Sequence, residues 1–293
     1  MSDIEMENEE KKNEVIEPIR LTDDRSIIEI FDSTEELLRV CDNRELNGWV
    51  SASRAARGRK TDSFVPKTYQ ETIDLMRYGS NEDAEALHQK ILEADDLFGW
   101  NVSGAGKQIT DVRGYAPSVP RALRNLPKSM YRRENKPKKG KIINIVYDMA
   151  VNCGVSAEQQ AQKGAEIVSV IQQLERLGYR VRLDIMAEFA DSGIMYVMRV
   201  KIKSEWNPLD IKKLAGIMTN VCFQRRVAFD WYERLPGAKY MSGYGTPFMN
   251  SSGAAQKFKS TFLKSNEYYI NFSSDLNTEF REKLTLDNIE VER

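Results

Sequence analysis

The pattern that most constrains the fold lies between residues 142 and 189. An apolar run of strand length, IINIVYDM, is rich in isoleucine and valine and contains Asp148 near its end; this is typical of a buried strand. A loop of small residues follows, then a helical segment. The next run, YRVRLDIMAEF, alternates apolar and polar residues, as a strand with one buried face does. This order predicts an α/β unit.

The helix in this unit has clear signals at both ends. Ser156 and Gln159 have the spacing of a capping box, in which each side chain satisfies a free backbone N–H group of the first turn. Gly178 follows the last apolar position and is expected to end the helix. The apolar residues between them share one helical face: Ala161, Ala165, Val168, Ile171 and Leu174.

The rest of the carboxyl-terminal half continues the α/β pattern. GIMYVMRVKIK follows a turn at 191–193 and predicts a hairpin with the preceding strand. Pro208 is expected at the first position of a helix, followed by one bent helix or two consecutive helices up to Pro236. EYYINFSS predicts the last strand.

These patterns divide the chain into four segments. We expect a disordered acidic tail at 1–24, a mainly helical region at 25–131, a basic linker at 132–141 and an α/β core at 142–293. The expected fold class is α/β, with α+β as the alternative. The core should contain a mixed sheet packed against helices as a sandwich.

Composition limits the kinds of functional site that the chain could contain. The net charge is −1, so nucleic-acid binding would need a local basic patch. The chain has three widely spaced cysteines and one histidine, His88, within an amphipathic helical pattern. This argues against a disulfide scaffold, a zinc site and a histidine-based triad. The start is acidic and no run is long enough to span a membrane, so we expect a cytoplasmic protein without membrane contact.

Asp148 is the candidate metal ligand. The sequence Asp148-x-Ala150-x-Asn152 resembles the Asp-x-Ser-x-Ser loop of von Willebrand factor A-type domains, but both serine positions differ. The resemblance implies that the α/β core is a von Willebrand factor A-like or Rossmann-like sandwich with a mixed sheet. A divalent-metal enzyme would use Asp148 with a second acid, Asp184 or Glu188, and Mg²⁺. The alternative is a metal-free turn and no cofactor. A second loop, NVSGAGKQIT, lacks the first glycine and the final Ser/Thr of a phosphate-binding loop, so we expect a simple turn there.

Two basic clusters are candidates for nucleic-acid binding, because clustered lysine and arginine neutralise phosphates. The alternative for both is a solvated linker. The clusters consist of Arg54, Arg57, Arg59, Lys60, Arg132, Arg133, Lys136, Lys138, Lys139 and Lys141. A third basic pair, Arg225 and Arg226, lies in the helical segment CFQRRVAFDWYERL. We expect both side chains to face outward, where they are candidates for protein binding.

Three segments between residues 112 and 233 carry a resemblance to known proteins: DVRGYAPSVPRALRNLPKSM, the capped helix with its following strand, and PLDIKKLAGIMTNVCFQRRVAFDWYE. Together they resemble a family of uncharacterised bacteriophage and prophage proteins. The family often has a histidine before the Arg-Arg pair. This chain has Asn220 or a neighbour there, so that histidine's role is not carried over. The resemblance implies a phage context and no established activity.

The resulting hypothesis is a non-enzymatic phage protein that binds another protein, either as an assembly component or as a modulator of a host factor. It would act in the host cytoplasm or in the virion. Nucleic-acid binding through the basic clusters and metal-dependent catalysis at Asp148 are the two alternatives. A second copy of the chain is a further partner that the sequence leaves open.

Overall fold

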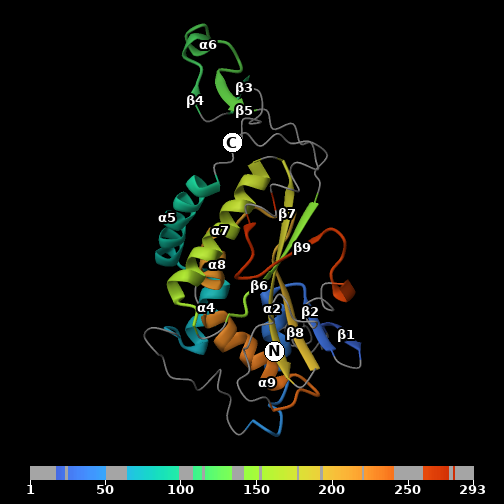
Figure 1. The fold of residues 1–293 in the computed structure, drawn as a ribbon. Helices are drawn as coiled ribbons and strands as arrows, with labels where there is room; N and C mark the ends of the chain where they lie inside the picture. The colour runs from blue at the N-terminus through green and yellow to red at the C-terminus, as the bar shows by residue number, and fades with distance from the viewer. Residues whose placement is uncertain are drawn as a thin grey trace, which may run out of the picture.

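The structure is a computed structural model. It describes residues 18–23, 26–50, 65–98, 108–113, 116–133, 142–151, 154–176, 178–191, 194–219, 221–240, 260–276 and 280. The described residues form a six-stranded mixed sheet with helices packed on it, and a separate three-stranded unit. Figure 1 shows both parts. The fold class is therefore α/β, as predicted. No helix in this described part combines the length and the apolar composition needed to cross a membrane.

The large sheet has the strand order β1-β2-β8-β7-β6-β9. β6 lies between two parallel neighbours, β7 and β9, and β7 and β8 form an antiparallel hairpin. β2 is parallel to β8, and β1 is the antiparallel edge strand. In order across the sheet, the bounds are β1 (Ile19–Asp23), β2 (Ser26–Phe31), β8 (Ile194–Lys203), β7 (Arg180–Asp191), β6 (Ile142–Asp148) and β9 (Glu267–Ile270).

The predicted strand, helix and strand around residue 160 are confirmed. α7 (Ala157–Arg176) connects β6 to β7. Its capping box forms as expected, since the Ser156 N–H donates to Gln159 Oε1 at 2.9 Å and the Gln159 N–H donates to Ser156 Oγ at 3.2 Å. The chain leaves the helix through Gly178, whose φ of 91° is accessible to glycine at little cost.

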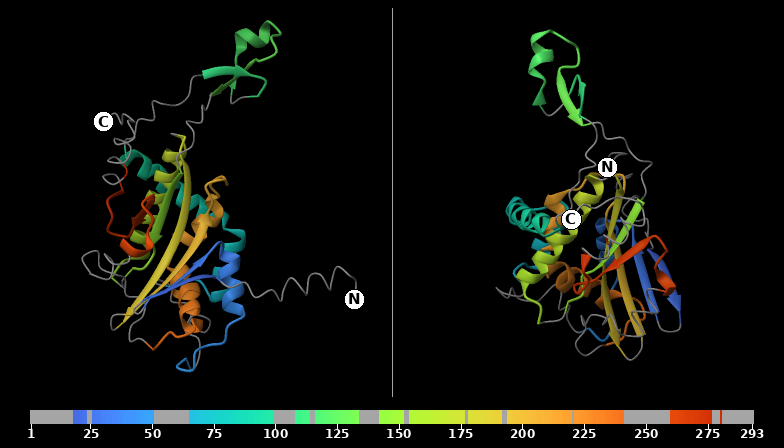
Figure 2. Two further views of the ribbon diagram at one scale, coloured as in Figure 1. Left: turned by 90° about the vertical axis from the view of Figure 1, so that its right-hand side faces the viewer. Right: turned by 45° about the horizontal axis from the view of Figure 1, so that its top comes forward.

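Helices cover one face of this sheet, as Figures 1 and 2 show. α5 packs on α7 and α8, and α4 packs on α8 and on a π-helix (Phe223–Ala228). The packing is close: a Cβ at Gly164 of α7 would lie 2.6 Å from the Met218 carbonyl oxygen of α8. The bounds are α2 (Thr34–Asp42), α4 (Tyr69–Tyr78), α5 (Asn81–Phe98), α8 (Ile211–Met218) and α9 (Phe229–Arg234).

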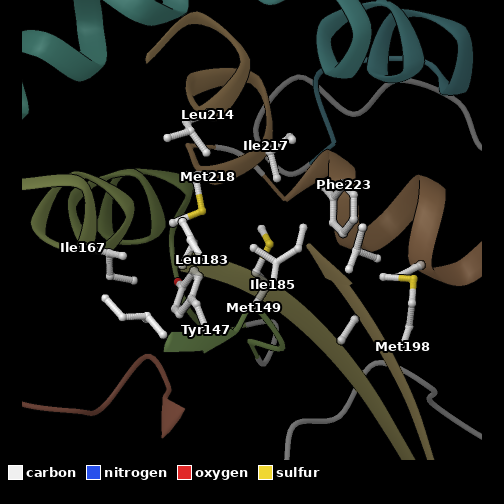
Figure 3. Packing of buried hydrophobic residues seen from close by; sticks show 14 of the residues in the cluster. Tyr147, Met149, Ile167, Leu183, Ile185, Met198, Leu214, Ile217, Met218 and Phe223 are labelled. Carbon is white, nitrogen blue, oxygen red and sulfur yellow. The ribbon is translucent and has the colours of Figure 1, made fainter. Parts of the chain in front are cut away.

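The main hydrophobic core lies between these helices and the sheet. Tyr147, Leu183 and Ile185 point from the strands toward Ile167 of α7 and Met218 of α8 (Figure 3). The opposite face of the sheet carries a smaller apolar cluster, which includes Val146, Met186 and Val197. Because successive side chains of a strand alternate between faces, Asp148 shares this second face with Val146.

Two boundaries differ from the prediction. β1 lies within the segment 1–24 that we expected to be disordered, and β1 and β2 belong to the same sheet as the core strands. The sheet therefore includes strands from both sides of the expected domain boundary. The prediction for Pro208 was wrong: α8 starts at Ile211, and its N-cap is Asp210, whose side chain accepts from the Lys213 N–H at 3.2 Å. A carboxylate can cap a helix end, which proline cannot do.

The smaller unit comprises residues 108–133 and is called the projecting unit below. Its strand order is β3-β5-β4, with both neighbours antiparallel to β5. A short helix, α6, connects β4 to β5. Figures 1 and 2 show the projecting unit apart from the large sheet and its helices. The bounds are β3 (Gln108–Asp111), β4 (Ala116–Pro117), α6 (Val119–Leu123) and β5 (Met130–Arg133).

Candidate functional site

Asp148 occupies the position where open α/β sheets often bind ligands. It is the last residue of β6. The parallel strands β7 and β9 flank β6, one on each side in the sheet. The carboxyl ends of these three strands therefore meet at one edge of the sheet. The crevice at such a reversal of strand order is the usual ligand position in this architecture.

The Asp148 carboxyl is enclosed by protein donors. It is 1% exposed. Its Oδ1 accepts from the Ala150 N–H at 2.9 Å, and its Oδ2 accepts from the Tyr269 hydroxyl at 2.6 Å. A further hydrogen bond connects it to the carboxyl of Glu188, which is also buried.

The electrostatics of this pair follow from its burial. Burial raises the pKa of Asp148 to about 6, and the hydrogen bonds from Tyr269, Ala150 and Glu188 oppose that rise. Burial also raises the pKa of Tyr269, and the nearby Asp148 charge adds to this effect. Tyr269 is therefore a neutral hydrogen-bond donor over the physiological pH range. The site therefore contains a buried carboxyl group that binds a proton more tightly than an exposed aspartate does.

The described residues do not fit the magnesium centre that Asp148 suggested. Ala150 offers no side-chain oxygen, and Asn152 lies outside the described residues. Both Asp148 oxygens already accept hydrogen bonds. Within the part of the chain that the structure describes, no group of three histidine, cysteine or acidic side chains could hold a metal ion.

The structure separates the two acids that were candidates to accompany Asp148. Glu188 joins it, whereas Asp184 belongs to an ion-pair network further along the same face. Arg182 donates to both Asp184 oxygens, at 2.7 and 2.9 Å. Arg199 donates to Asp184 at 2.7 Å and to Glu267 at 2.6 Å. Asp184 therefore belongs to an ion-pair network that connects β7, β8 and β9.

A cavity of about 430 Å³ lies beyond the carboxyl ends of β2 and β8. Three lysines line it, but two have partners within the protein. Lys201 donates to Asp32 at 2.8 Å, and Lys203 contacts Glu175 at 2.6 Å and the Val181 carbonyl at 2.8 Å. These pairs reduce the positive charge that the cavity offers to an anion.

The projecting unit exposes its apolar side chains. Of its side chains that the structure describes, at 110–113 and 116–131, only Ser118 is buried. Leu123 is 82% exposed, Val112 69%, Val119 59% and Leu126 37%. Val119 and Leu123 are four residues apart in α6 and so share one helix face. This small unit presents the hydrophobic surface that a domain would normally bury.

Local hydrogen bonds hold this surface in place. Asn125 has a φ of 52° and ends α6 in a Schellman arrangement, in which the Leu126 N–H donates to the Arg121 carbonyl at 3.1 Å. The Ser118 N–H donates to the Ser129 carbonyl at 2.7 Å, and Arg121 Nε donates to the Lys128 carbonyl at 2.9 Å. The conformation of the projecting unit therefore rests on backbone geometry rather than on apolar packing.

Most residues of the two predicted basic clusters lie outside the described residues: Arg54, Arg57, Arg59, Lys60, Lys136, Lys138, Lys139 and Lys141. Arg132 and Arg133 are in β5 of the projecting unit, which contains a further basic group outside the two predicted clusters. That group is Arg113, Arg121, Arg124 and Lys128. The signal was present in VRGYAPSVPRALRNLPK, where basic and apolar residues are interspersed without acids.

Arg225 and Arg226 belong to the π-helix. The expectation that both face outward was wrong for Arg226, which is 2% exposed and donates to the Lys67 carbonyl at 3.0 Å. Arg225 is half-buried, with its guanidinium 5.2 Å from the Phe229 ring centre. The extra residue of a π-helical turn rotates the following side chains, and this rotation could not be read from a regular helical spacing.

The chain belongs to a family defined by a domain of unknown function, DUF7192, whose model matches residues 9–289. The matched range thus spans the large sheet, its helices and the projecting unit. No curated protein matches the chain, and no solved structure matches it either. The predicted relationship to an uncharacterised family is confirmed at this level.

Proposed function

We propose that this protein acts by binding another protein through the projecting unit. The observation that carries this proposal is the exposure of Val119 and Leu123 on one face of a helix that buries none of its own residues. None of the apolar side chains described in this unit is buried, so their packing adds little to its stability. A partner that covers this face would supply the missing apolar contact.

Charge favours a particular kind of protein surface. Residues 108–133 contain six basic side chains and one acidic side chain. An apolar groove with an acidic rim complements such a surface, because the apolar residues drive affinity and the charges guide orientation. Nucleic acid would satisfy the arginines but would offer little to Leu123 and Val119. The exposed apolar side chains therefore favour a protein partner over nucleic acid.

The phage context is part of the same proposal, as is a role without catalysis. The partner would be a phage or host protein, met in the host cytoplasm or in the virion. We also infer a von Willebrand factor A-like or Rossmann-like sandwich for the core. The position of Asp148 at the crevice of the sheet supports this.

Affinity capture with the full-length protein tests the proposal. The wild type and Tyr78→Asp should retain the same partner after nuclease treatment, since Tyr78 is 76% exposed and belongs to α4, which is not part of the projecting unit. Leu123→Asp should reduce recovery of that partner about tenfold or more, as expected for loss of a central apolar contact. Recovery that Leu123→Asp leaves unchanged would contradict the proposal. Loss of the partner on nuclease treatment would instead indicate nucleic acid.

A further inference from the structure

The cavity of about 430 Å³ lies at the edge of the large sheet opposite to Asp148. β8 is antiparallel to β7 and parallel to β2, so the carboxyl ends of β2 and β8 lie at one edge and those of β6, β7 and β9 at the other. The volume is within the range of small-molecule sites, and the carboxyl ends of parallel strands are a usual place for them. The cavity is therefore a candidate site separate from Asp148 and from the projecting unit.

The cavity combines buried apolar residues with a polar mouth. Met76 of α4 and Leu214 and Ile217 of α8 line it, and each of the three is 2% exposed. Polar residues of the lining are closer to solvent: Ser33 is half-buried and Asn207 is exposed. This distribution suits a ligand that has an apolar body and one polar end.

Five charged side chains line the cavity, and four of them are engaged within the protein. Lys201 and Asp32 form an ion pair, and Lys203 contacts a glutamate of α7. Asp210 is the N-cap of α8, and its carboxylate accepts from the Lys213 N–H at 3.2 Å. The ammonium group of Lys213 has no ion pair or hydrogen bond with any residue that the structure describes. The cavity therefore offers one unpaired positive charge.

The position of Lys213 makes its unpaired charge unfavourable. It lies in the first turn of α8, near the positive end of the helix dipole, where a cation is destabilising. That turn contains no acidic residue after the cap. The N-terminal residues of α2, Ser33 and Thr34, line the same cavity, whereas the two glutamates in the first turn of α2 do not. A single negative charge bound here is stabilised by Lys213 and by the ends of two helices.

We propose that this cavity binds a small molecule with an apolar body and one carboxylate group. The apolar body lies against Met76, Leu214 and Ile217, and the carboxylate accepts a hydrogen bond from the Lys213 ammonium group. Because only one cation of the lining is unpaired, a single negative charge fits better than a phosphate ester, which carries about two. This site goes beyond the proposed protein binding and does not depend on it.

Calorimetric titration of the full-length protein with octanoate tests the proposal. One octanoate should bind per chain. Octylamine has the same chain but is positively charged at neutral pH, and it should bind about tenfold more weakly or worse because it places a second cation beside Lys213. Hexanoate should bind about tenfold more weakly than octanoate, since two buried methylene groups are lost. These three titrations use the wild type alone, so they need no assumption about the folding of a variant.

Substitutions then locate the site. Lys213→Glu should weaken octanoate binding about tenfold or more, because repulsion replaces a charge-assisted hydrogen bond. The matched control is Lys212→Glu, which makes the same charge change at an exposed neighbour outside the cavity lining and should bind octanoate like the wild type. Leu123→Asp should also bind like the wild type, so this proposal and the proposed protein binding can fail separately.

Three outcomes would overturn the proposal. The first is the absence of saturable octanoate binding by the wild type. The second is equal affinity of the wild type for octanoate and octylamine, which would remove the role of the negative charge. The third is equal octanoate affinity of Lys213→Glu and Lys212→Glu, which would place the bound molecule outside this cavity.

Discussion

Burial disfavours the charged form of the Asp148 carboxyl, while hydrogen bonds from the protein stabilise it. Its carboxyl is buried beside Glu188 and accepts from the Tyr269 hydroxyl and the Ala150 N–H. Burial of a carboxyl group disfavours its charged form. The folded-state pKa, about 6, therefore lies above the ordinary value of 3.8. The folded protein binds this proton more tightly than the unfolded chain does.

The raised pKa of Asp148 makes the free energy of unfolding depend on pH. Because the folded state holds the proton more tightly, the contribution of Asp148 to the free energy of unfolding falls as the pH rises from about 4 to about 6. Asp148→Asn removes this ionisation. At pH 7.5 we expect the variant to exceed the wild type in free energy of unfolding by up to about 3 kcal/mol.

Urea unfolding at pH 4.5 and pH 7.5 measures this difference, with the wild type as reference at each pH. The advantage of Asp148→Asn should shrink at pH 4.5, where the wild-type carboxyl is already protonated. A variant that is less stable than the wild type at pH 7.5 would show that the hydrogen bonds to the carboxylate outweigh the cost of its burial.

At the scale of elements, the strands β7, β8 and β9 are joined by a buried ion-pair network. Arg199 connects Asp184 to Glu267, and all three side chains are at most 8% exposed. A buried network is costly to break, since removal of Arg199 leaves the buried Glu267 without its arginine partner. Arg77 and Glu35 form a comparable arginine–carboxylate pair between α4 and α2, but these side chains are 36% and 47% exposed.

This contrast predicts different effects of the same substitution. Arg199→Leu should lower the free energy of unfolding by about 3–5 kcal/mol, because Glu267 loses its arginine partner in a buried position. Arg77→Leu should lower it by at most about 1 kcal/mol, because water and salt screen an exposed pair. Denaturant titrations of both variants provide the comparison. Equal losses would mean that the network is not the buried connection between the strands that its geometry indicates.

At the scale of the whole molecule, stability and the proposed binding surface are separate. The large sheet and its helices contain the extensive core, whereas the projecting unit buries only Ser118 among its described side chains. We therefore expect substitutions in the projecting unit to leave the global unfolding transition unchanged, even where they weaken the proposed binding.

Leu123→Asp should leave the free energy of unfolding within about 0.5 kcal/mol of the wild type, because Leu123 is 82% exposed. Leu174→Ala in α7 is the matched core substitution. It should lower the free energy of unfolding by about 2–5 kcal/mol, because that side chain is fully buried. Thermal and urea unfolding measure both. A large destabilisation by Leu123→Asp would mean that the side chain packs against the body of the protein.

The sequence by itself determined the local elements. Hydrophobic periodicity and capping signals predicted β6, α7, β7 and the β7–β8 hairpin, because these depend on residues close together in the chain. The tertiary structure decided what distant residues do together. It joined β1 and β2 to the core sheet, paired Asp148 with Glu188 rather than Asp184, and buried Arg226. It also left the apolar residues of α6 exposed. Burial and pairing depend on packing between distant segments, and local periodicity contains no information about that packing.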